Sequence, residues 1–314
     1  MNSLLHIRNA DVYVTGSNSK FLSSDVITQF RGRGDEIHVY PLSFSEYVPA
    51  CQGSVDEAWD DYLIYGGMPL ILTMAEPEDK AAYLNSLFQK VYISDIVERH
   101  DVRNKVELDE LVDILASAIG SYTNQSKLVR TFKSVKGKTI SDKTIKNYID
   151  YLIDSFLISK AVRYDIKGKK YIGSPSKYYF EDVGLRNARL GFRQVEQTHL
   201  MENIIYNELR IRGYHVDVGV VEYYGANREG KRGKKQLEVD FVATKGSEKH
   251  YIQSAFTLPT ADKVDQEQRR LLRIPDSFRK IVIVGDNIKV RRDENGIITI
   301  GLRNFLLDEN SLRL

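Results

Sequence analysis

Cysteine is almost absent from this sequence, which has only Cys51. An internal disulfide is therefore excluded, and a reducing, cytoplasmic compartment is the simplest expectation. The six histidines show no pairing at the spacing of a zinc site, so no metal centre is predicted from them. No apolar run approaches the roughly 18 to 20 residues of a membrane span, and the first residues lack the basic-then-apolar pattern of a secretory signal. We therefore expect no membrane partner.

A phosphate loop is also missing. The nearest match is the run from Gly225 to Arg232, which fits the first seven positions of such a loop. Arg232 then stands where a Ser or Thr hydroxyl must hold Mg²⁺, and a strand pattern follows where the loop requires a helix. The sequence therefore predicts no nucleotide binding in this run.

Neither sign of charge is in clear excess, since 45 basic residues face 43 acidic ones and give a net charge of +2. Any nucleic-acid partner must then be met by local basic patches and not by the overall field. A length of 314 residues with 42% hydrophobic and 28% charged residues is typical of a globular protein of two or three domains.

The stretch from Ala10 to Tyr47 has the pattern of part of a parallel α/β sheet. We predict a buried strand over Asp11 to Thr15, a polar tip, an amphipathic helix, a basic turn, and a second strand over Ile37 to Tyr40. Two strands leave both faces and both edges uncovered. We therefore expect further strands from a longer chain or another polypeptide, and association through the open edge.

The motifs of this stretch resemble the last quarter of an AAA-type ATPase core of the bacterial and archaeal kind. They are T-G-S-N ending at Asn18, R-G-R from Arg31 to Arg33, and P-L-S-F-S-E-Y from Pro41 to Tyr47. The residues that follow resemble the domain of unknown function found after this core. The resemblance implies that Met1 starts inside an ATPase-type domain and that ATP and Mg²⁺ are cofactors of the parent family.

The same resemblance implies that Asn18 is a nucleotide-sensing residue and that Arg31 and Arg33 are finger-like arginines. Without a phosphate loop these residues have no bound nucleotide to sense. We therefore predict that this chain alone does not hydrolyse ATP and has no cofactor of its own.

Residues 51–106 are predicted to form a small helical lid. A helix over Asp56 to Tyr65 is closed by Gly66-Gly67-Met68-Pro69, and a second helical stretch runs from Pro77 to about Glu98. Paired glycines with a proline stop a helix sharply, so we interpret them as a structural turn in preference to a binding loop.

Residues 107–186 have the pattern of a winged helix-turn-helix. An apolar helical face runs from Leu108 to Ile119, a short helix follows over Asn124 to Phe132, and Ser141 caps a third helix. A hairpin with strands at Leu157 to Tyr164 and Lys177 to Glu181 is the predicted wing.

Lysines cluster on the third helix and the wing, where they would reach DNA phosphates. The alternative is that they form the solvated face of a protein-interaction module. Few side chains suited to reading bases lie on the helix, so backbone binding is favoured over sequence recognition. The predicted nucleic-acid-binding lysines are Lys138, Lys143 and Lys146 on the helix, and Lys167, Lys169 and Lys170 on the wing.

Residues 187–314 resemble a PD-(D/E)xK nuclease. Glu202 lies on a predicted helix, Asp240 on a strand, and Gln253 and Ala255 on the next strand, which we expect to be antiparallel to the one carrying Asp240. Such enzymes hold a divalent metal with two acids and use a lysine two residues on to activate water. Gln253 and Ala255 replace the second acid and the lysine, so a degenerate site is predicted.

A basic loop before Asp240 is expected to be a hairpin tip, either solvated or in contact with phosphates. Its candidate residues are Arg228, Lys231, Arg232, Lys234 and Lys235.

Taken together, the sequence predicts an α/β and α+β multidomain fold. The expected parts are an AAA-type core remnant over 1–50, the lid over 51–106, the winged helix over 107–186 and a degenerate restriction-endonuclease-like domain over 187–314. The favoured function is a non-catalytic module that binds DNA through its backbone. The alternatives are a residual metal-dependent nuclease acting through Glu202 and Asp240, and a protein-interaction platform for a separate ATPase subunit.

Overall fold

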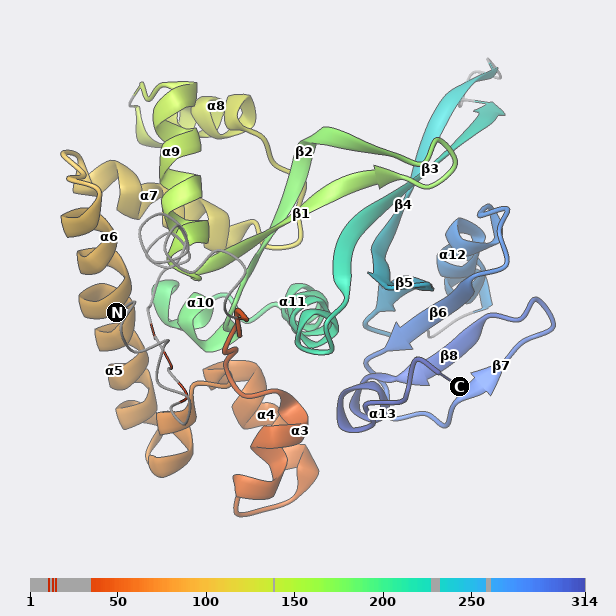
Figure 1. Ribbon diagram of the computed structural model, residues 1–314, viewed down its shortest axis with the longest axis horizontal. Coiled ribbons are helices and arrows are strands. Elements are labelled where there is room, and N and C mark those ends of the chain that lie inside the picture. The colour runs from red at the N-terminus through yellow and green to blue at the C-terminus, as the bar shows by residue number, and fades with distance from the viewer. Residues whose placement is uncertain are drawn as a thin grey trace.

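The computed structural model describes residues 11, 13, 15, 35–137, 139–226, 232–257 and 261–313. A group of helices formed by the first half of the chain lies beside a long twisted sheet formed by the second half (Figure 1). Within these residues, no helix has the length and apolar character needed to cross a membrane.

The first described segment, residues 35–40, has no regular secondary structure. Ile37 and Val39 are 77% and 86% exposed, whereas the Tyr40 ring lies 5.3 Å from the Arg210 guanidinium. The predicted strand over Ile37 to Tyr40 is therefore wrong, because no neighbouring strand among the described residues pairs with it. Asp11, Tyr13 and Thr15, the described residues of the other predicted strand, are exposed and not in a strand.

The two helical stretches predicted within residues 51–106 are confirmed, and a short helix that was not predicted, α3, precedes them. Ser43 and Glu46 form a capping box at the first helix, and Ser54 and Glu57 form another at α4. The segment from Pro77 is helical throughout, with a short π-helix in its middle. The elements are α3 (Phe44–Tyr47), η3 (Val48–Ala50), α4 (Val55–Tyr65), η4 (Pro69–Thr73), α5 (Pro77–Leu87), η5 (Phe88–Ile93) and α6 (Ser94–Arg99).

The paired glycines after α4 form a structural turn, as predicted. The backbone N–H of Gly67 donates to the buried Asp182 carboxylate at 2.7 Å. A Cβ atom on Gly67 would lie 2.2 Å from the Leu42 carbonyl oxygen, and one on Gly184 would lie 1.9 Å from that of Tyr65. Only glycine allows these two backbone segments to approach so closely.

Three helices and a hairpin follow in the predicted order. The helices are α7 (Lys105–Ser117), α8 (Gln125–Lys136) and α9 (Asp142–Asp154), whose N-caps are Asn104, Asn124 and Ser141. The hairpin strands are β1 (Ile158–Asp165), which lies within one residue of its predicted bounds, and β2 (Lys170–Phe180), which begins earlier than predicted.

The last part of the chain adds six strands to this hairpin. The resulting eight-stranded mixed sheet has the order β2-β1-β3-β4-β5-β6-β8-β7, in which the β1–β3, β5–β6 and β6–β8 pairs are parallel. Its remaining elements are α10 (Val183–Arg189), α11 (Gln197–Ile211), β3 (His215–Ala226), β4 (Arg232–Lys245), β5 (Glu248–Ala255), α12 (Ala261–Leu272), β6 (Arg279–Val284), β7 (Arg291–Arg292), β8 (Ile298–Gly301) and α13 (Leu302–Leu307).

The sheet continues across residue 186, where the sequence analysis places a domain boundary. Arg163, Tyr164 and Asp165 of β1 pair with residues 218–220 of β3. The hairpin predicted as a wing is therefore also part of the sheet that carries the predicted nuclease residues.

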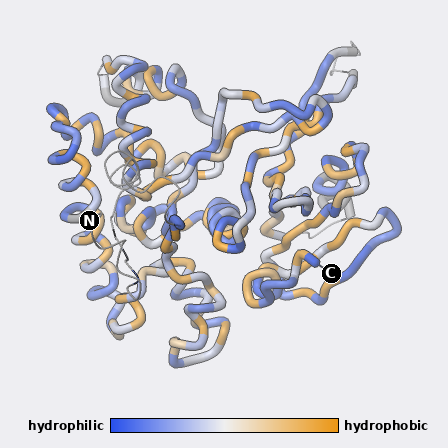
Figure 2. The backbone as a smooth tube through the Cα atoms, viewed as in Figure 1, coloured by the Kyte–Doolittle hydropathy of each residue, from blue (hydrophilic) through white to orange (hydrophobic). Residues whose placement is uncertain are grey.

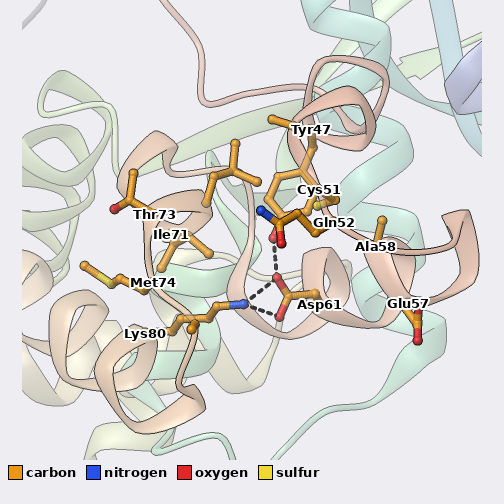
Figure 3. Close-up of a pocket in the computed structure, with 13 residues that line it drawn as sticks. Tyr47, Cys51, Gln52, Glu57, Ala58, Asp61, Ile71, Thr73, Met74 and Lys80 are labelled. Carbon is orange, nitrogen blue, oxygen red and sulfur yellow. Dashed lines mark hydrogen bonds and ion pairs between the residues drawn. The ribbon is translucent and has the colours of Figure 1, made fainter.

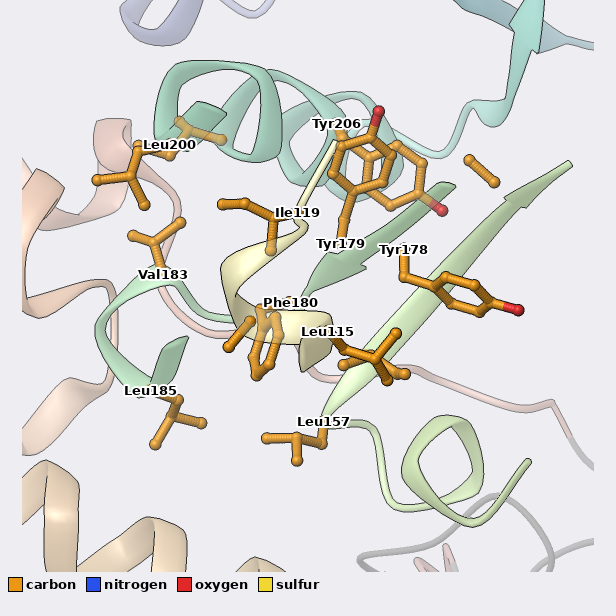
Figure 4. Close-up of a cluster of buried hydrophobic side chains, with 14 of the residues drawn as sticks. Leu115, Ile119, Leu157, Tyr178, Tyr179, Phe180, Val183, Leu185, Leu200 and Tyr206 are labelled. Carbon is orange, nitrogen blue, oxygen red and sulfur yellow. The ribbon is translucent and has the colours of Figure 1, made fainter. Parts of the chain in front are cut away.

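The hydrophobic core joins the helical part to the sheet. Its central portion gathers Leu115 and Ile119 of the α7 region, Phe180 of β2, and Leu200 of α11 (Figure 4). A second buried cluster, which includes Val221, Val239 and Leu271, lies between the sheet and α12. Figure 2 shows hydrophobic colouring along β6 and β8, in contrast to the hydrophilic outer end of the β3–β4 hairpin. The two buried clusters thus hold the centre of the sheet in place, whereas the β1–β2 turn lies away from them and is exposed.

Candidate functional site

The predicted nuclease residues lie on three elements of the second half, with Glu202 on α11, Asp240 on β4 and Gln253 on β5. β4 and β5 are antiparallel neighbours, as expected. The Gln253 amide nitrogen donates to Asp240 Oδ2 at 2.6 Å, and the negative charge of Glu202 acts on Asp240. The fold therefore brings the three predicted side chains to one region.

The side chain of Lys177 on β2 also lies in this region, and no sequence pattern marked it as a site residue. Its Nζ lies 2.8 Å from a Glu202 oxygen and 2.6 Å from a Glu238 oxygen, and its side chain is only 4% exposed. Burial acts to lower the pKa of Lys177, but the two carboxylates outweigh burial and raise it. The ammonium is therefore held in its charged form between two acids.

Aromatic side chains surround this lysine and its partners. The Tyr179 hydroxyl donates to the same Glu202 oxygen at 2.6 Å, and the Tyr179 ring stacks on Tyr206 with ring centres 4.2 Å apart. The Tyr122 ring centre lies 5.6 Å from Lys177 Nζ. A Cβ atom on Gly120 would lie 3.2 Å from the Glu202 carboxylate, so the chain passes close to this carboxylate as well. These contacts fix Glu202 and restrict the space around it.

Asp240 is buried and has an altered acidity. Burial, followed by the charge of Glu202, raises its pKa to about 7, although Lys177 and the Ser254 N–H bond act in the opposite direction. Gln253 is 1% exposed, and its amide oxygen has no hydrogen-bond partner within the described part of the chain. Gln253 therefore uses its donor on Asp240 and presents no negative charge to it.

The donor set does not suit a divalent cation. Within the residues that the structure describes, no three His, Cys, Asp or Glu side chains are grouped so that they could hold a metal ion. Lys177 places a positive charge beside Glu202 and Glu238, and Ala255 stands on β5 where the nuclease pattern has its lysine. Glu202 and Glu238 thus already share a cation that the chain itself supplies.

The predicted basic residues fall into two separate groups. Lys143 and Lys146 are exposed on α9, whereas Lys167, Lys169 and Lys170 lie at the turn between β1 and β2. Figure 1 shows this turn beside the β3–β4 hairpin and away from α9. The helix lysines and the wing lysines therefore do not form one continuous surface.

The β1–β2 turn is instead close to the lysines of β4. Lys234 is exposed and pairs with Glu222 at 2.5 Å, and Lys170 is near enough for its charge to contribute to the lowered pKa of Glu222, which is due mainly to Lys234. Lys235 is half-buried on the opposite face of the strand. The pairing of β1 with β3 is what brings these two hairpins together.

Several predicted residues lie outside the described part. These are Asn18, Arg31, Arg33, Lys138, Arg228 and Lys231. Arg232 begins β4, but its side chain is not among those described.

Comparison with known proteins gives two family matches, one at the amino-terminal end and one in the segment that follows it. Residues 2–48 match the family described as an AAA domain, and residues 56–196 match a domain of unknown function (DUF8612). An uncharacterized protein from Haemophilus influenzae is 35% identical over 312 residues, which cover 98% of this chain and 73% of that protein. This chain belongs to the same family as the Haemophilus influenzae protein.

A second relative, the uncharacterized protein MJ1544 from Methanocaldococcus jannaschii, is 27% identical over 292 residues. The matched region covers 89% of this chain and 62% of that relative. A crystal structure of protein VC1899 from Vibrio cholerae covers 89% of this chain at 12% identity with a TM-score of 0.27, which is too low to support a common fold. The two family models thus confirm the AAA-type resemblance of the first residues and the domain of unknown function that follows them.

A cavity of about 450 Å³ lies where the two matched family segments meet (Figure 3). Tyr47 belongs to the AAA-type segment, and Asp61 and Lys80 belong to the second. Lys80 Nζ lies 2.6 and 2.7 Å from the two Asp61 oxygens, and the Tyr47 hydroxyl donates to the same carboxylate. Burial, followed by this bond, raises the pKa of Tyr47. These three polar groups bond to one another and connect the two segments.

Proposed function

We propose that residues 107–313 of this AAA-type family member act as a non-catalytic nucleic-acid-binding module. In this proposal the three helices α7 to α9 with the β1–β2 hairpin are a winged helix, and the sheet from β3 onward is a degenerate PD-(D/E)xK nuclease-like domain. The phosphate backbone is the ligand, and lysines are the contacts.

The observation that carries this proposal is that Lys177 forms two ion pairs, one with Glu202 and one with Glu238. An active centre of this nuclease type needs free carboxylates for a divalent cation. Glu202 and Glu238 instead share one buried ammonium, and Gln253 occupies one oxygen of Asp240. Metal binding here would require Lys177 to be displaced and an uncompensated buried cation to be tolerated, which costs several kcal/mol. The region supports a folded, inactive centre.

The binding half of the proposal rests on the exposed lysines of the two hairpins. Lys167, Lys169 and Lys170 lie at one hairpin end and Lys234 lies in the other. Cations on neighbouring protrusions can follow a phosphate backbone without reading bases. The near-neutral net charge makes such a local cluster the relevant electrostatic feature.

A salt series with a labelled duplex tests this function. We expect the logarithm of the binding constant to fall linearly with the logarithm of salt concentration. The combined variant Lys167→Gln, Lys169→Gln, Lys170→Gln should make this slope shallower by up to about 0.9 for each phosphate that is no longer neutralised. A matched variant, Lys143→Gln with Lys146→Gln, measures the separate contribution of α9. Absence of binding at low salt would refute the proposal.

A residual nuclease is the second candidate, because the structure places Lys177 near Glu202 and Asp240, where the sequence indicated no lysine. Its test is cleavage of duplex or single-stranded DNA with Mn²⁺ or Mg²⁺. Cleavage that Asp240→Ala abolishes would establish this activity and would replace the non-catalytic proposal.

Interaction with an ATPase subunit is supported by a different surface. Ile37 and Val39 follow the R-G-R motif in the sequence and expose apolar side chains to solvent. We propose that a strand of an ATPase core covers them. Replacing both residues with Ser should reduce association with such a subunit and leave nucleic-acid binding unchanged.

A further inference from the structure

The β3–β4 hairpin extends beyond the rest of the sheet as a two-stranded arm. β1 pairs with β3 only as far as Val220, whereas β3 and β4 remain paired up to Ala226 and Arg232. Figure 1 shows this arm protruding past the β1–β2 turn. A protruding arm contributes little to the core, so side chains displayed on it are available for contacts with a partner.

One face of this arm combines a cation with an exposed aromatic ring. Tyr224 is 82% exposed and stands directly opposite Lys234 in the register of the two strands, so both side chains point to the same face. The Lys234 side chain is 58% exposed and pairs with Glu222 of the same face, so a phosphate would compete with this carboxylate for the ammonium. An aromatic ring exposed to this extent buries almost no apolar surface and does not stabilise the fold.

The same face is continuous with the β1–β2 hairpin. Asp165 pairs with Lys170 on one side and with Val220 on the other, and Val220 pairs with Glu238. Residues at paired positions share a face, and alternate residues of one strand also share a face, which places Val220 with Tyr224. Lys170 therefore lies on the face that carries Tyr224 and Lys234. The bond from Arg163 to Gln236, at 2.7 Å, connects the two hairpins on this face.

The opposite face of the arm is already occupied. Arg273, in the loop after α12, lies 4.2 Å from the centre of the Tyr223 ring, and Val221 is part of the buried cluster under α12. Tyr171 is 60% exposed, but it pairs with Tyr164 on this second face. The arm is therefore anchored on one side and open on the side of Tyr224.

Building on the proposed function, we infer that this open face binds single-stranded nucleic acid, with a base stacked on Tyr224 and phosphates on Lys170 and Lys234. Stacking on an aromatic ring requires an unpaired base, because the rings of a duplex are covered by their neighbours. Lysines next to such a ring supply sequence-independent backbone contacts. A duplex would use the lysines and leave Tyr224 without a role.

The test is fluorescence anisotropy of the full chain with labelled oligo(dT), oligo(rU), an abasic oligonucleotide and a hairpin duplex. We expect both single strands to bind more tightly than the duplex. Tyr224→Ala should weaken binding of oligo(dT) and oligo(rU) about tenfold, in line with the loss of one stacked base, and should leave the affinity for the abasic strand unchanged. Tyr171→Ala, an exposed tyrosine on the other face, should change affinity less than twofold.

Each other outcome counts against a specific claim. If the duplex binds at least as tightly as the single strands, or if Tyr224→Ala has no more effect than Tyr171→Ala, the inference is overturned while the proposed function stands. If none of these nucleic acids binds at low salt, the proposed function fails, and the inference fails with it.

Discussion

At the scale of single residues, Lys177 occupies two of the carboxylates that a metal ion in this part of the sheet would need. A single buried ammonium lies between Glu202 and Glu238 and offsets part of their negative charge, and Tyr179 adds a hydrogen bond to Glu202. Buried ion pairs of this kind add little net stability compared with apolar residues, but breaking one is costly because a charge remains unpaired. Lys177 is therefore the residue whose removal is most informative.

Lys177→Met should destabilise the protein by about 3 to 5 kcal/mol, since it leaves two carboxylates near each other without their cation. Urea denaturation followed by circular dichroism measures this change. The control is Lys160→Met on β1, an exposed lysine that should change stability by less than about 0.5 kcal/mol. Adding Glu202→Gln to Lys177→Met should recover part of the loss, and equal losses in the single and double variants would contradict the proposed pairing.

Asp240 should give the unfolding free energy a recognisable dependence on pH. Its folded pKa of about 7 lies above the unfolded value of about 3.9. Between these two values the folded state binds more protons, so wild-type stability should fall as pH rises through this window. Asp240→Asn lacks this contribution, and the difference between the proteins should change by at most about 1.4 kcal/mol per pH unit.

Urea denaturation of both proteins from about pH 4.5 to about pH 7.5 measures this dependence. Asp182, whose pKa burial raises to about 6, contributes in the same direction in both proteins and cancels in the comparison. Parallel stability curves for wild type and Asp240→Asn would show that Asp240 is not buried as described.

The sequence could identify Glu202, Asp240 and Gln253 because each lies in a local pattern that predicts its helix or strand. It could not identify Lys177. That lysine reaches the others only through the pairing of β2 with β1 and of β1 with β3, which joins residues more than fifty positions apart along the chain. Local periodicity contains no information about such a contact.

At the scale of elements, the junction between α4 and α10 holds the helical part against the start of the second half. Asp182 is the N-cap of α10 and also accepts from the Gly67 N–H, so one carboxylate serves both segments. Gly184 lies directly against the Tyr65 carbonyl. The motif Gly66-Gly67 is thus explained by contact with a segment more than one hundred residues away.

Gly184→Ala should destabilise the protein by about 3 kcal/mol or more, because its Cβ would lie 1.9 Å from the Tyr65 oxygen and backbone must move. Thermal denaturation measures the effect. Gly173→Ala on β2 is the matched control, since a Cβ atom there meets nothing within 4 Å. If the two variants have equal stability, the close approach of α10 to the end of α4 is wrong.

Helices were predicted more successfully than strands. Apolar periodicity, with the Ser141 cap for α9, located α4, α7, α8 and α9 to within a few residues. The strand predicted at Ile37 to Tyr40 has the right composition, but a strand also requires a neighbour. No described strand lies beside it, and composition alone could not reveal this.

At the scale of the whole molecule, one sheet joins the regions predicted as winged helix and nuclease-like domain, and one main hydrophobic cluster joins both to the region predicted as lid. The cluster includes residues from Phe44 to Leu312. Shared cores couple the stability of the segments that form them. The division at residue 186 stays a prediction about ancestry, whereas physical coupling across it follows from the β1–β3 pairing.

Unfolding should therefore be cooperative across this boundary. Trp59, the single tryptophan, packs on Phe44 in the helical part with ring centres 5.4 Å apart, and its fluorescence reports on that part. Far-UV circular dichroism reports on the whole chain. We expect the two transitions to coincide in urea. A fluorescence midpoint clearly separate from the dichroism midpoint would show that the helical part and the sheet unfold independently.

The claim that this molecule holds nucleic acid without cutting it is tested most directly by a single incubation. The purified chain is mixed at low salt with an end-labelled oligonucleotide and Mn²⁺, and the mixture is run on a native gel and on a denaturing gel. The account predicts a shifted band on the first and full-length oligonucleotide on the second. Shortened fragments that disappear with Asp240→Ala, or no shift at all, would contradict it.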